Sequence, residues 1–264
     1  AFGPVYYGPS GARVSTQDGC TVKLEPSGVV RVMTRVTDQG QGTLTGIAQI
    51  VGDQLGVDIE DIDVLAGDSA TTPYGGGAWA SRGMAMGGEA ALHAGKALKE
   101  NILDLASSIL QTSSSALTLE GGEIRDAVSG EARMDLAELA KVGYFRQDTL
   151  PAGTQPELMV TRHHVPDTPY YIANGVQGAQ VEVDIDTGFI KLLGWWVADD
   201  CGRVVNPLMV DEQIRGGVIQ GIGNTLYEHS QYDETGQLLN ATLADYLLPM
   251  LSLIHISEPT RLRS

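Results

Sequence analysis

The sequence predicts an α+β fold, in which hairpins and helices occupy separate runs of the chain. Apolar and polar residues alternate in Thr21–Leu24 and Val29–Val36 around the turn sequence EPSG, which is the pattern of a hairpin. Between Met84 and Leu110, apolar residues recur every three or four positions, as on a helix with one buried face. The segment AQVEVDIDTGFIKLLGWWVADDC places two strands around an Asp-Thr-Gly turn. Because strands and helices do not alternate, we expect α+β rather than a βαβ series.

The remaining elements follow from the same patterns in chain order. Helices are expected at Ile47–Leu55 and Asp135–Val142, and a strand is expected at Asp61–Asp68. Gly143–Tyr171 contains four prolines, so we expect an irregular crossover there. A last helix is expected at Val210–Tyr227, which contains four glycines.

Composition limits the class of protein. The chain has 264 residues, enough for one large domain or two small ones, and 42% of them are hydrophobic. No apolar run approaches the roughly 18 residues that a membrane span needs, so no span is expected. The net charge of −16 argues against a nucleic-acid partner, which would require a basic surface. Cys20 and Cys201 are too few for a disulfide framework, so we expect a reducing, cytoplasmic setting.

The first candidate site is a glutamine between two glycines. Gly40-Gln41-Gly42 lets a ligand approach the backbone, and the helix that follows would aim its free N–H groups at an anion. A dinucleotide fingerprint is excluded, because its third glycine would fall at Thr45. The side chain of Gln41 adds an amide that both donates and accepts. We predict donors for a polar ligand here, and the alternative is a tight turn without one.

The second candidate site is PYGGGAWASRG, another glycine cluster ahead of a helix. Ser81 and Arg82 stand where that helix is expected to begin. A hydroxyl, a guanidinium and free backbone N–H groups suit a phosphate. The alternative is that Ser81 only caps the helix and Arg82 lies on the surface.

The third candidate site is the loop VADDCGRVVNP. Cys201 has no CxxC or nearby histidine partner, so no metal site of protein ligands is expected there. Asp200 and Asn206 are expected to cap and brace the loop. The pair His163-His164 lacks a third ligand in the sequence, so we expect a structural or solvent-facing role for it.

The fourth candidate site is the helix sequence DEQIRGGVIQGIGNTLYE. Core packing would explain its glycines. It does not explain Gln213 and Gln220, which are seven positions apart and therefore on one side of a helix. We expect them to form a smooth, amide-bearing face together with Gly217, Gly221 and Gly223.

In this order the motifs resemble one family. The segments DQGQG…AQIVGDQLGV…GDSATTPYGGGAWASR, VEVDIDTG…VADDCGRVVNP and QIRGGVIQGIGNTLYE…YDETGQLL…ADYLLP are similar to the large subunit of the molybdenum hydroxylases. That family includes xanthine dehydrogenase, aldehyde oxidase and aerobic carbon monoxide dehydrogenase, and the last resembles the chain most. The resemblance covers about Gly3 to Met250. It implies a truncated form of the second molybdopterin-binding domain, with two subdomains of antiparallel hairpins and packed helices.

The resemblance also implies a cofactor, a reaction and partners. The cofactor would be molybdenum-molybdopterin, expected in the cytosine dinucleotide form, with its metal held by the pterin and not by protein side chains. Family members oxidise a small molecule, such as an aldehyde, an N-heterocycle or carbon monoxide, with water as the oxygen source. The implied partners are a flavin-binding medium subunit with FAD and an iron–sulfur small subunit with [2Fe-2S] clusters, assembled as a dimer of heterotrimers.

The implied cofactor contacts fall on the motifs above. They are Gly40, Gln41, Gly42, Ala80, Ser81, Arg82, Asp200, Cys201, Asn206 and Gln220. The family's catalytic glutamate would lie beyond Met250 and its metal-side loop before Ala1, so no catalytic residue is assigned. We therefore expect the chain, expressed alone, to turn over no substrate.

The expected domain is residues 1–250, with possible subdomains 1–143 and 172–250 and the crossover 144–171. The last segment, LSLIHISEPTRLRS, resembles a translated sequencing adapter, so residues 251–264 are expected to be a non-native tail. One alternative function is a non-catalytic relative that serves as a binding or assembly module. Another, a phosphate-ester enzyme, would need a nucleophile or a metal-binding carboxylate cluster that the sequence does not show.

Overall fold

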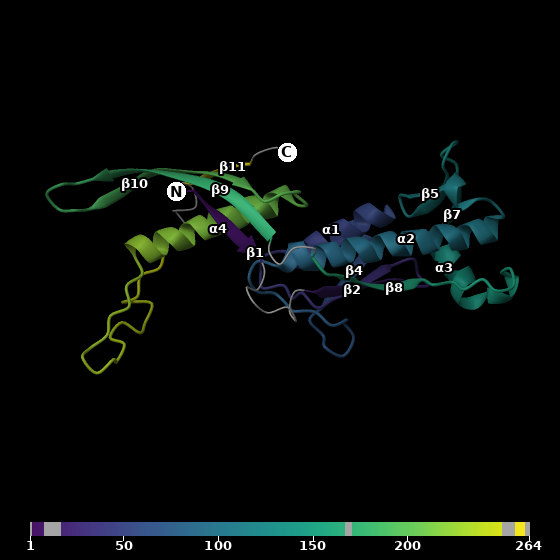
Figure 1. Cartoon of the computed structure of the whole chain (residues 1–264), viewed down its shortest axis with the longest axis horizontal. Coiled ribbons are helices and arrows are strands. Elements are labelled where there is room, and N and C mark those ends of the chain that lie inside the picture. The colour runs from purple at the N-terminus through teal and green to yellow at the C-terminus, as the bar shows by residue number, and fades with distance from the viewer. Residues whose placement is uncertain (1, 8–16, 167–170, 250–256, 262–264) are drawn as a thin grey trace. The chain divides into compact units, whose positions relative to one another are not determined.

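The computed structural model describes residues 2–7, 17–166, 171–249 and 257–261 (Figure 1). The chain forms two compact units. The first unit is Tyr7–Tyr171, and the second is Ala1–Tyr6 with Ile172–Ser264. Compared with the predicted subdomains, the second unit also takes in the first residues of the chain, and the first unit extends through the predicted crossover.

A four-stranded sheet of order β4-β3-β2-β8 forms the framework of the first unit. Strands β2 (Asp18–Leu24) and β3 (Val30–Thr34) form the predicted hairpin. Helix α1 (Thr43–Leu55) then connects β3 to β4 (Ile62–Ala66), which pairs with β3 in parallel. Because α1 returns the chain to the edge of the hairpin, the sheet contains one βαβ connection. The sequence did not predict this connection.

The long helix crosses this sheet and supplies most of its cover. A π-helical turn, Gly83–Gly88, precedes α2 (Glu89–Leu110), and α2 packs against β2, β8 and α1. The predicted apolar face of α2 is buried at five positions and half-buried at Ile109; the five are Ala91, Gly95, Leu98, Ile102 and Leu105. Glycine at 87 allows close packing, since a Cβ there would lie 2.6 Å from Val36. The resulting core includes Val22, Leu98 and Ile102, all fully buried.

The predicted crossover is not irregular throughout. Met159–His164 forms strand β8, which pairs antiparallel with β2. The prolines lie outside β8, so they do not interrupt its ladder. The first unit also holds a small sheet of order β5-β6-β7 and the predicted helix α3, which Asp135 caps through the N–H of Glu138 at 2.6 Å. Their bounds are Leu117–Glu120 for β5, Glu123–Asp126 for β6, Ala132–Asp135 for β7 and Leu136–Phe145 for α3.

The second unit is a sheet of order β1-β9-β10-β11 with one helix. Strands β9 (Tyr171–Val183) and β10 (Ile190–Asp200) form the predicted hairpin around the Asp-Thr-Gly turn. The predicted helix is α4 (Pro207–Leu226), and β1 is Phe2–Tyr7. Strand β11 (Ser257–Arg261) lies in the segment that the sequence analysis left out of the fold, and it pairs with β10 in parallel. No helix in the described ranges is long and apolar enough to cross a membrane.

Candidate cofactor-binding site

Two of the predicted glycine-rich loops lie beside each other in the first unit. Gln39, in the loop before α1, donates its side-chain amide to the carbonyl of Ala78 in the other loop at 3.5 Å. Met84, directly after that other loop, packs on Gly46 of α1, where a Cβ would come within 2.9 Å of its methyl group. The fold thus brings segments 37–42 and 75–82 together, although some 40 residues separate them in the sequence.

The carboxylate of Asp38, in the loop before α1, accepts hydrogen bonds from backbone N–H groups at the N-terminus of this helix. Asp38 accepts hydrogen bonds from the backbone N–H of Gly40 at 2.7 Å and of Leu44 at 3.2 Å. Partial burial acts to raise the pKa of Asp38, but backbone donors that include Gly42 and Thr43 outweigh it and lower this pKa. The prediction that α1 directs free N–H groups at a ligand is therefore wrong for the backbone N–H groups that already donate to Asp38.

The backbone of Gly40 remains open on its Cβ side, although its N–H donates to Asp38. Its φ is 101°, and nothing lies within 4 Å of the position that a Cβ would occupy. Gly42 has a φ of 77° and precedes the first helical residue. The amide of Gln41 is turned back on its own loop, where Oε1 accepts from the N–H of Gln39 and Nε2 donates to the carbonyl of Thr37 at 3.4 Å. The Cβ side of Gly40 is therefore open, whereas the amide of Gln41 is engaged within the loop.

Ala80 and Ser81 hold a strained backbone conformation. Their φ values are 50° and 55°, and both residues are exposed. In the described part of the chain, the only other non-glycine residue with positive φ is Gln111, which ends α2. The left-handed conformation costs roughly 1–2 kcal/mol per residue in L-amino acids. Strain of this kind concentrates at ligand sites, where the surrounding structure enforces it.

Arg82 lies inside the protein and forms an ion pair with Asp18. Its Nη1 is 2.6 Å from Oδ2 of Asp18, and the two side chains are 1% and 0% exposed. The guanidinium also donates to the carbonyl of Gly77 at 2.8 Å and to that of Gln17 at 3.0 Å. The structure therefore gives the guanidinium of Arg82 an internal partner, where the sequence analysis expected it to face a phosphate.

The ion pair accounts for part of the glycine cluster. A Cβ on Gly75 would lie 2.0 Å from Oδ1 of Asp18, and a Cβ on Gly76 would lie 2.6 Å from Nη1 of Arg82. The loop can cover the pair only because these positions have no side chain. Gly77 is different: its φ is 77°, and nothing lies within 4 Å of its Cβ position, so its Cβ side is as clear as that of Gly40.

Burial controls the ionisation of the groups beneath these loops. It raises the pKa of Asp18, although Arg82 and the N–H groups of Gly19 and Gly76 act in the opposite direction. Burial, and then the charge of Asp18, raise the pKa of the Cys20 thiol to about 12. Cys20 is consequently a neutral core residue rather than a reactive thiol.

Four of the predicted site residues belong to the second unit. Asp200 ends β10 and accepts from the N–H of Gly202 at 3.1 Å. Asn206 caps α4 by accepting from the N–H of Met209 at 3.2 Å. The prediction that these two residues brace and cap the loop is confirmed, and Cys201 between them is exposed. The fourth residue, Gln220, is exposed on α4.

One side of α4 is smooth, as predicted, but Gly223 does not belong to it. Gln213, Gly217 and Gln220 are exposed, and no atom lies within 4 Å of a Cβ placed on Gly217. Gly223 is buried, and its Cβ would lie 2.6 Å from Pro249. Gly223 is three positions after Gln220 and therefore near it on the helix, but Pro249 covers this position.

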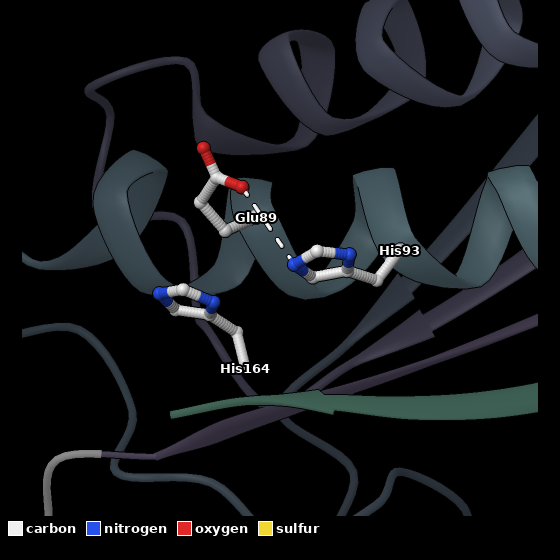
Figure 2. Close-up of side chains that lie close together, drawn as sticks. All are labelled: Glu89, His93 and His164. Atoms are coloured by element: carbon white, nitrogen blue, oxygen red, sulfur yellow. Dashed lines mark ion pairs between the residues drawn. The ribbon is translucent and has the colours of Figure 1, made fainter. Parts of the chain in front are cut away.

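One residue of the pair His163-His164 lies near two candidate ligands that the sequence did not indicate. His164 lies at the end of β8, next to Glu89 and His93 of α2 (Figure 2). The candidate ligand atoms of the three side chains lie within 4.8 Å of one another. None of the three is among the predicted cofactor residues.

Sequence reasoning missed residues whose roles depend on long-range contacts. Asp18 and Arg82 are 64 positions apart, and no local pattern connects them. Asp38 carried a usable signal, because aspartate shortly before a helix is a capping candidate. Glu89 and His93 have the i,i+4 spacing of one helix face, but only the pairing of β8 with β2 brings His164 to them.

The comparisons with known proteins define the class. The molybdopterin cofactor-binding domain family matches residues 1–255 of this chain. The chain belongs to this family, which confirms the predicted relationship and supports a molybdopterin cofactor.

Named relatives and solved structures agree with this assignment. The chain is 34% identical over 253 residues to the nicotine 6-hydroxylase large subunit of Paenarthrobacter nicotinovorans, covering 96% of this chain and 30% of that one. It is 30% identical over 232 residues to the carbon monoxide dehydrogenase large chain of Hydrogenophaga pseudoflava, covering 88% and 28% of the two chains. The structure of quinoline 2-oxidoreductase from Pseudomonas putida 86 matches with a TM-score of 0.86 at 33% identity, over 100% of this chain and 35% of that one. The α+β fold class is confirmed, and the chain spans about a third of the length of these relatives.

Proposed function

We propose that this chain is the cofactor-binding portion of the large subunit of a molybdenum hydroxylase. The strained, exposed backbone at Ala80 and Ser81, next to the loop of Gly40, carries the proposal. The Cβ sides of Gly40 and Gly77 are clear, so main-chain groups of both loops can touch a flat pterin and its diphosphate. The residues of the first unit therefore fit such a cofactor. The non-catalytic alternative is not favoured, since the named relatives are enzymes.

Each predicted residue is assigned a contact by type. Gly40, Gly42, Ala80 and Ser81 would offer backbone groups, and the hydroxyl of Ser81 would add a donor to a phosphate oxygen. Gln41 would turn its amide outward from its present loop contacts. Arg82 would act indirectly. Its buried ion pair with Asp18 would hold the strained turn at Ala80 and Ser81 in place. In the second unit, Asp200, Cys201 and Asn206 would contribute from the loop before α4, and Gln220 from its exposed face.

The bound cofactor would supply a two-electron oxidation in which water provides the oxygen atom. We propose an aromatic N-heterocycle as the substrate class to test first. Support comes from the nicotine and quinoline enzymes, which are 34% and 33% identical to this chain. The carbon monoxide dehydrogenase of Hydrogenophaga pseudoflava is 30% identical, so carbon monoxide is the second candidate.

We further propose the cytosine dinucleotide form of the cofactor and an assembly with flavin and iron–sulfur partners in the cytoplasm. The names of the relatives support a multi-subunit assembly, since they are a large subunit, a large chain and a subunit of a dehydrogenase complex. A flavin-binding medium subunit, an iron–sulfur small subunit and a dimer of heterotrimers complete the proposal.

Cofactor content tests the proposal directly. The chain is purified from a bacterial host that makes the cofactor and is grown with molybdate. Molybdenum is measured by mass spectrometry, and the oxidised pterin by its fluorescence. We expect both, with CMP released on acid hydrolysis. Gly77→Ala is expected to reduce bound pterin roughly tenfold or more, equivalent to about 1.4 kcal/mol of binding free energy, because its Cβ would enter the space of the cofactor.

Gly130→Ala is the matched control. Gly130 lies in the turn between β6 and β7, has a φ of 72° and, like Gly77, has nothing near its Cβ position. Both substitutions impose the same backbone strain, but only the one at Gly77 is expected to affect the cofactor. Equal pterin content in the two variants, or a wild-type chain without molybdenum and pterin, would contradict the proposal.

A further inference from the structure

The side chains of Glu89, His93 and His164 lie together in the first unit (Figure 2). Glu89 and His93 are one turn apart at the start of α2, and Oε2 of Glu89 is 3.9 Å from Nε2 of His93. The rings of His93 and His164 are stacked, with their centroids 5.7 Å apart. From this geometry we propose that the three side chains bind a zinc ion, which links α2 to β8.

The placement follows from the register of the sheet. His164 pairs with Asp18, so both side chains lie on one face of the sheet. The neighbouring His163 pairs with Gly19, and its ring packs where a Cβ of Gly19 would be, at 2.8 Å. Because side chains alternate along a strand, His164 faces α2 and His163 faces the other side. Only one of the two histidines can therefore join the residues of α2.

The ligand set suits zinc. Zinc in proteins takes imidazole nitrogens and carboxylate oxygens at about 2.0–2.2 Å, usually four ligands in a tetrahedron. Such ligands stand roughly 3.3 Å apart, so the observed separations of up to 4.8 Å require only side-chain rotation. His93 and Glu89 are 48% and 45% exposed, which leaves them free to turn and leaves the fourth position to water. Two imidazoles and a carboxylate are a poor set for calcium or magnesium, which prefer oxygen ligands alone.

The bound ion would fasten one end of α2 to the sheet. The contact between Glu89 and His93 is an i,i+4 contact within α2. The ion would add a cross-link between residues that are about 70 positions apart in the sequence. We therefore expect zinc to stabilise the folded first unit by mass action.

Zinc titration of the full chain, with any affinity tag removed, tests the proposal. We expect one equivalent to bind with a dissociation constant at or below about 10 µM, and cobalt to give the visible absorption of a tetrahedral site. His93→Ala and His164→Ala are each expected to weaken zinc binding at least about tenfold, since loss of even a supporting partner costs that much. His163→Ala is the control and should bind zinc as the wild type does.

Melting temperatures with and without zinc provide a second test in case a variant folds too poorly for titration. Zinc should raise the melting temperature of the wild type and of His163→Ala, but not that of His93→Gln, in which an exposed helix residue is replaced. The proposal is overturned if His163→Ala weakens binding as much as His164→Ala does, or if His93→Gln keeps the zinc effect. Zinc binding weaker than about 100 µM would also overturn it. Molybdenum and pterin content are measured separately, so failure here leaves the cofactor proposal standing.

Discussion

Individual residues in the first unit take their roles from partners far away in the sequence. Arg82 has the surroundings of a core residue, and Asp18 beneath it is fully buried. Gly75 and Gly76 are required because a loop must pass directly over this pair. A sequence motif that suggests an anion site therefore includes residues that build the loop, as well as residues that face outward from it.

The buried ion pair gives a prediction about stability. Arg82→Met leaves the carboxylate of Asp18 buried without its cation, which is expected to cost about 3–5 kcal/mol at pH 7. Without Arg82, burial raises the pKa of Asp18 further. A raised folded-state pKa means that stability is retained at low pH and lost as the pH rises from 3.8 through the folded-state pKa. Because this pKa is higher in the variant, its deficit relative to the wild type should be smallest at acidic pH and should grow as the pH rises past the already raised pKa of Asp18 in the wild type. Urea unfolding of the variant and of the wild type at several pH values measures this loss of stability.

The same substitution on the surface serves as the control. Arg31 pairs with Asp63 at 3.3 Å, but the two side chains are 47% and 59% exposed. Arg31→Met is therefore expected to change the free energy of unfolding by less than about 1 kcal/mol. A similar loss in the two variants would show that the pair with Asp18 has no special role.

At the level of elements, two glycines of α4 have opposite surroundings. No atom lies within 4 Å of a Cβ placed on Gly217, whereas a Cβ on Gly223 would lie 2.6 Å from Pro249. The close approach of Pro249 thus explains the glycine at 223, whereas no such contact explains Gly217. The open side is the one that carries Gln220, a residue we assign to the cofactor.

This contrast predicts opposite effects for one substitution. Gly217→Ala should stabilise α4 by about 1 kcal/mol, because alanine has the higher helix propensity and its Cβ meets nothing. Gly223→Ala should destabilise the second unit, because its Cβ would lie 2.6 Å from a rigid proline ring. Denaturant unfolding, followed by the fluorescence of Trp195 and Trp196 in a Trp79→Phe background, separates the two. Equal effects would contradict the surroundings assigned to Gly217 and Gly223.

At the scale of the whole molecule, the two units have very different cores. The large apolar cluster among the described residues joins α1, α2, α3 and strands of the first unit. The cluster in the second unit consists of Val197, Val218 and Ile222, with partly buried neighbours. Since burial of apolar surface is the main source of stability, the first unit should be the more stable one.

Hydrogen exchange can test this difference. Amides of β2, β3 and α2 are expected to exchange far more slowly than those of β9, β10 and α4, because local stability follows the density of buried contacts. Exchange of the full chain, followed by peptide mass spectrometry, gives the comparison. Equal protection in β9 and β2 would show that the small cluster of the second unit is not what limits its stability.

The sequence alone determined the local elements and the family. Periodicity located α2, α3, α4 and both hairpins, because the spacing of apolar residues is a local property. The order of glycine-rich motifs identified the molybdopterin cofactor-binding family, which the match over residues 1–255 confirms. Only the tertiary structure decided that Arg82 pairs with Asp18, that Asp38 closes α1, and that His164 meets His93. The physical reason is that sheet register and helix packing join residues whose separation along the chain carries no signal of contact.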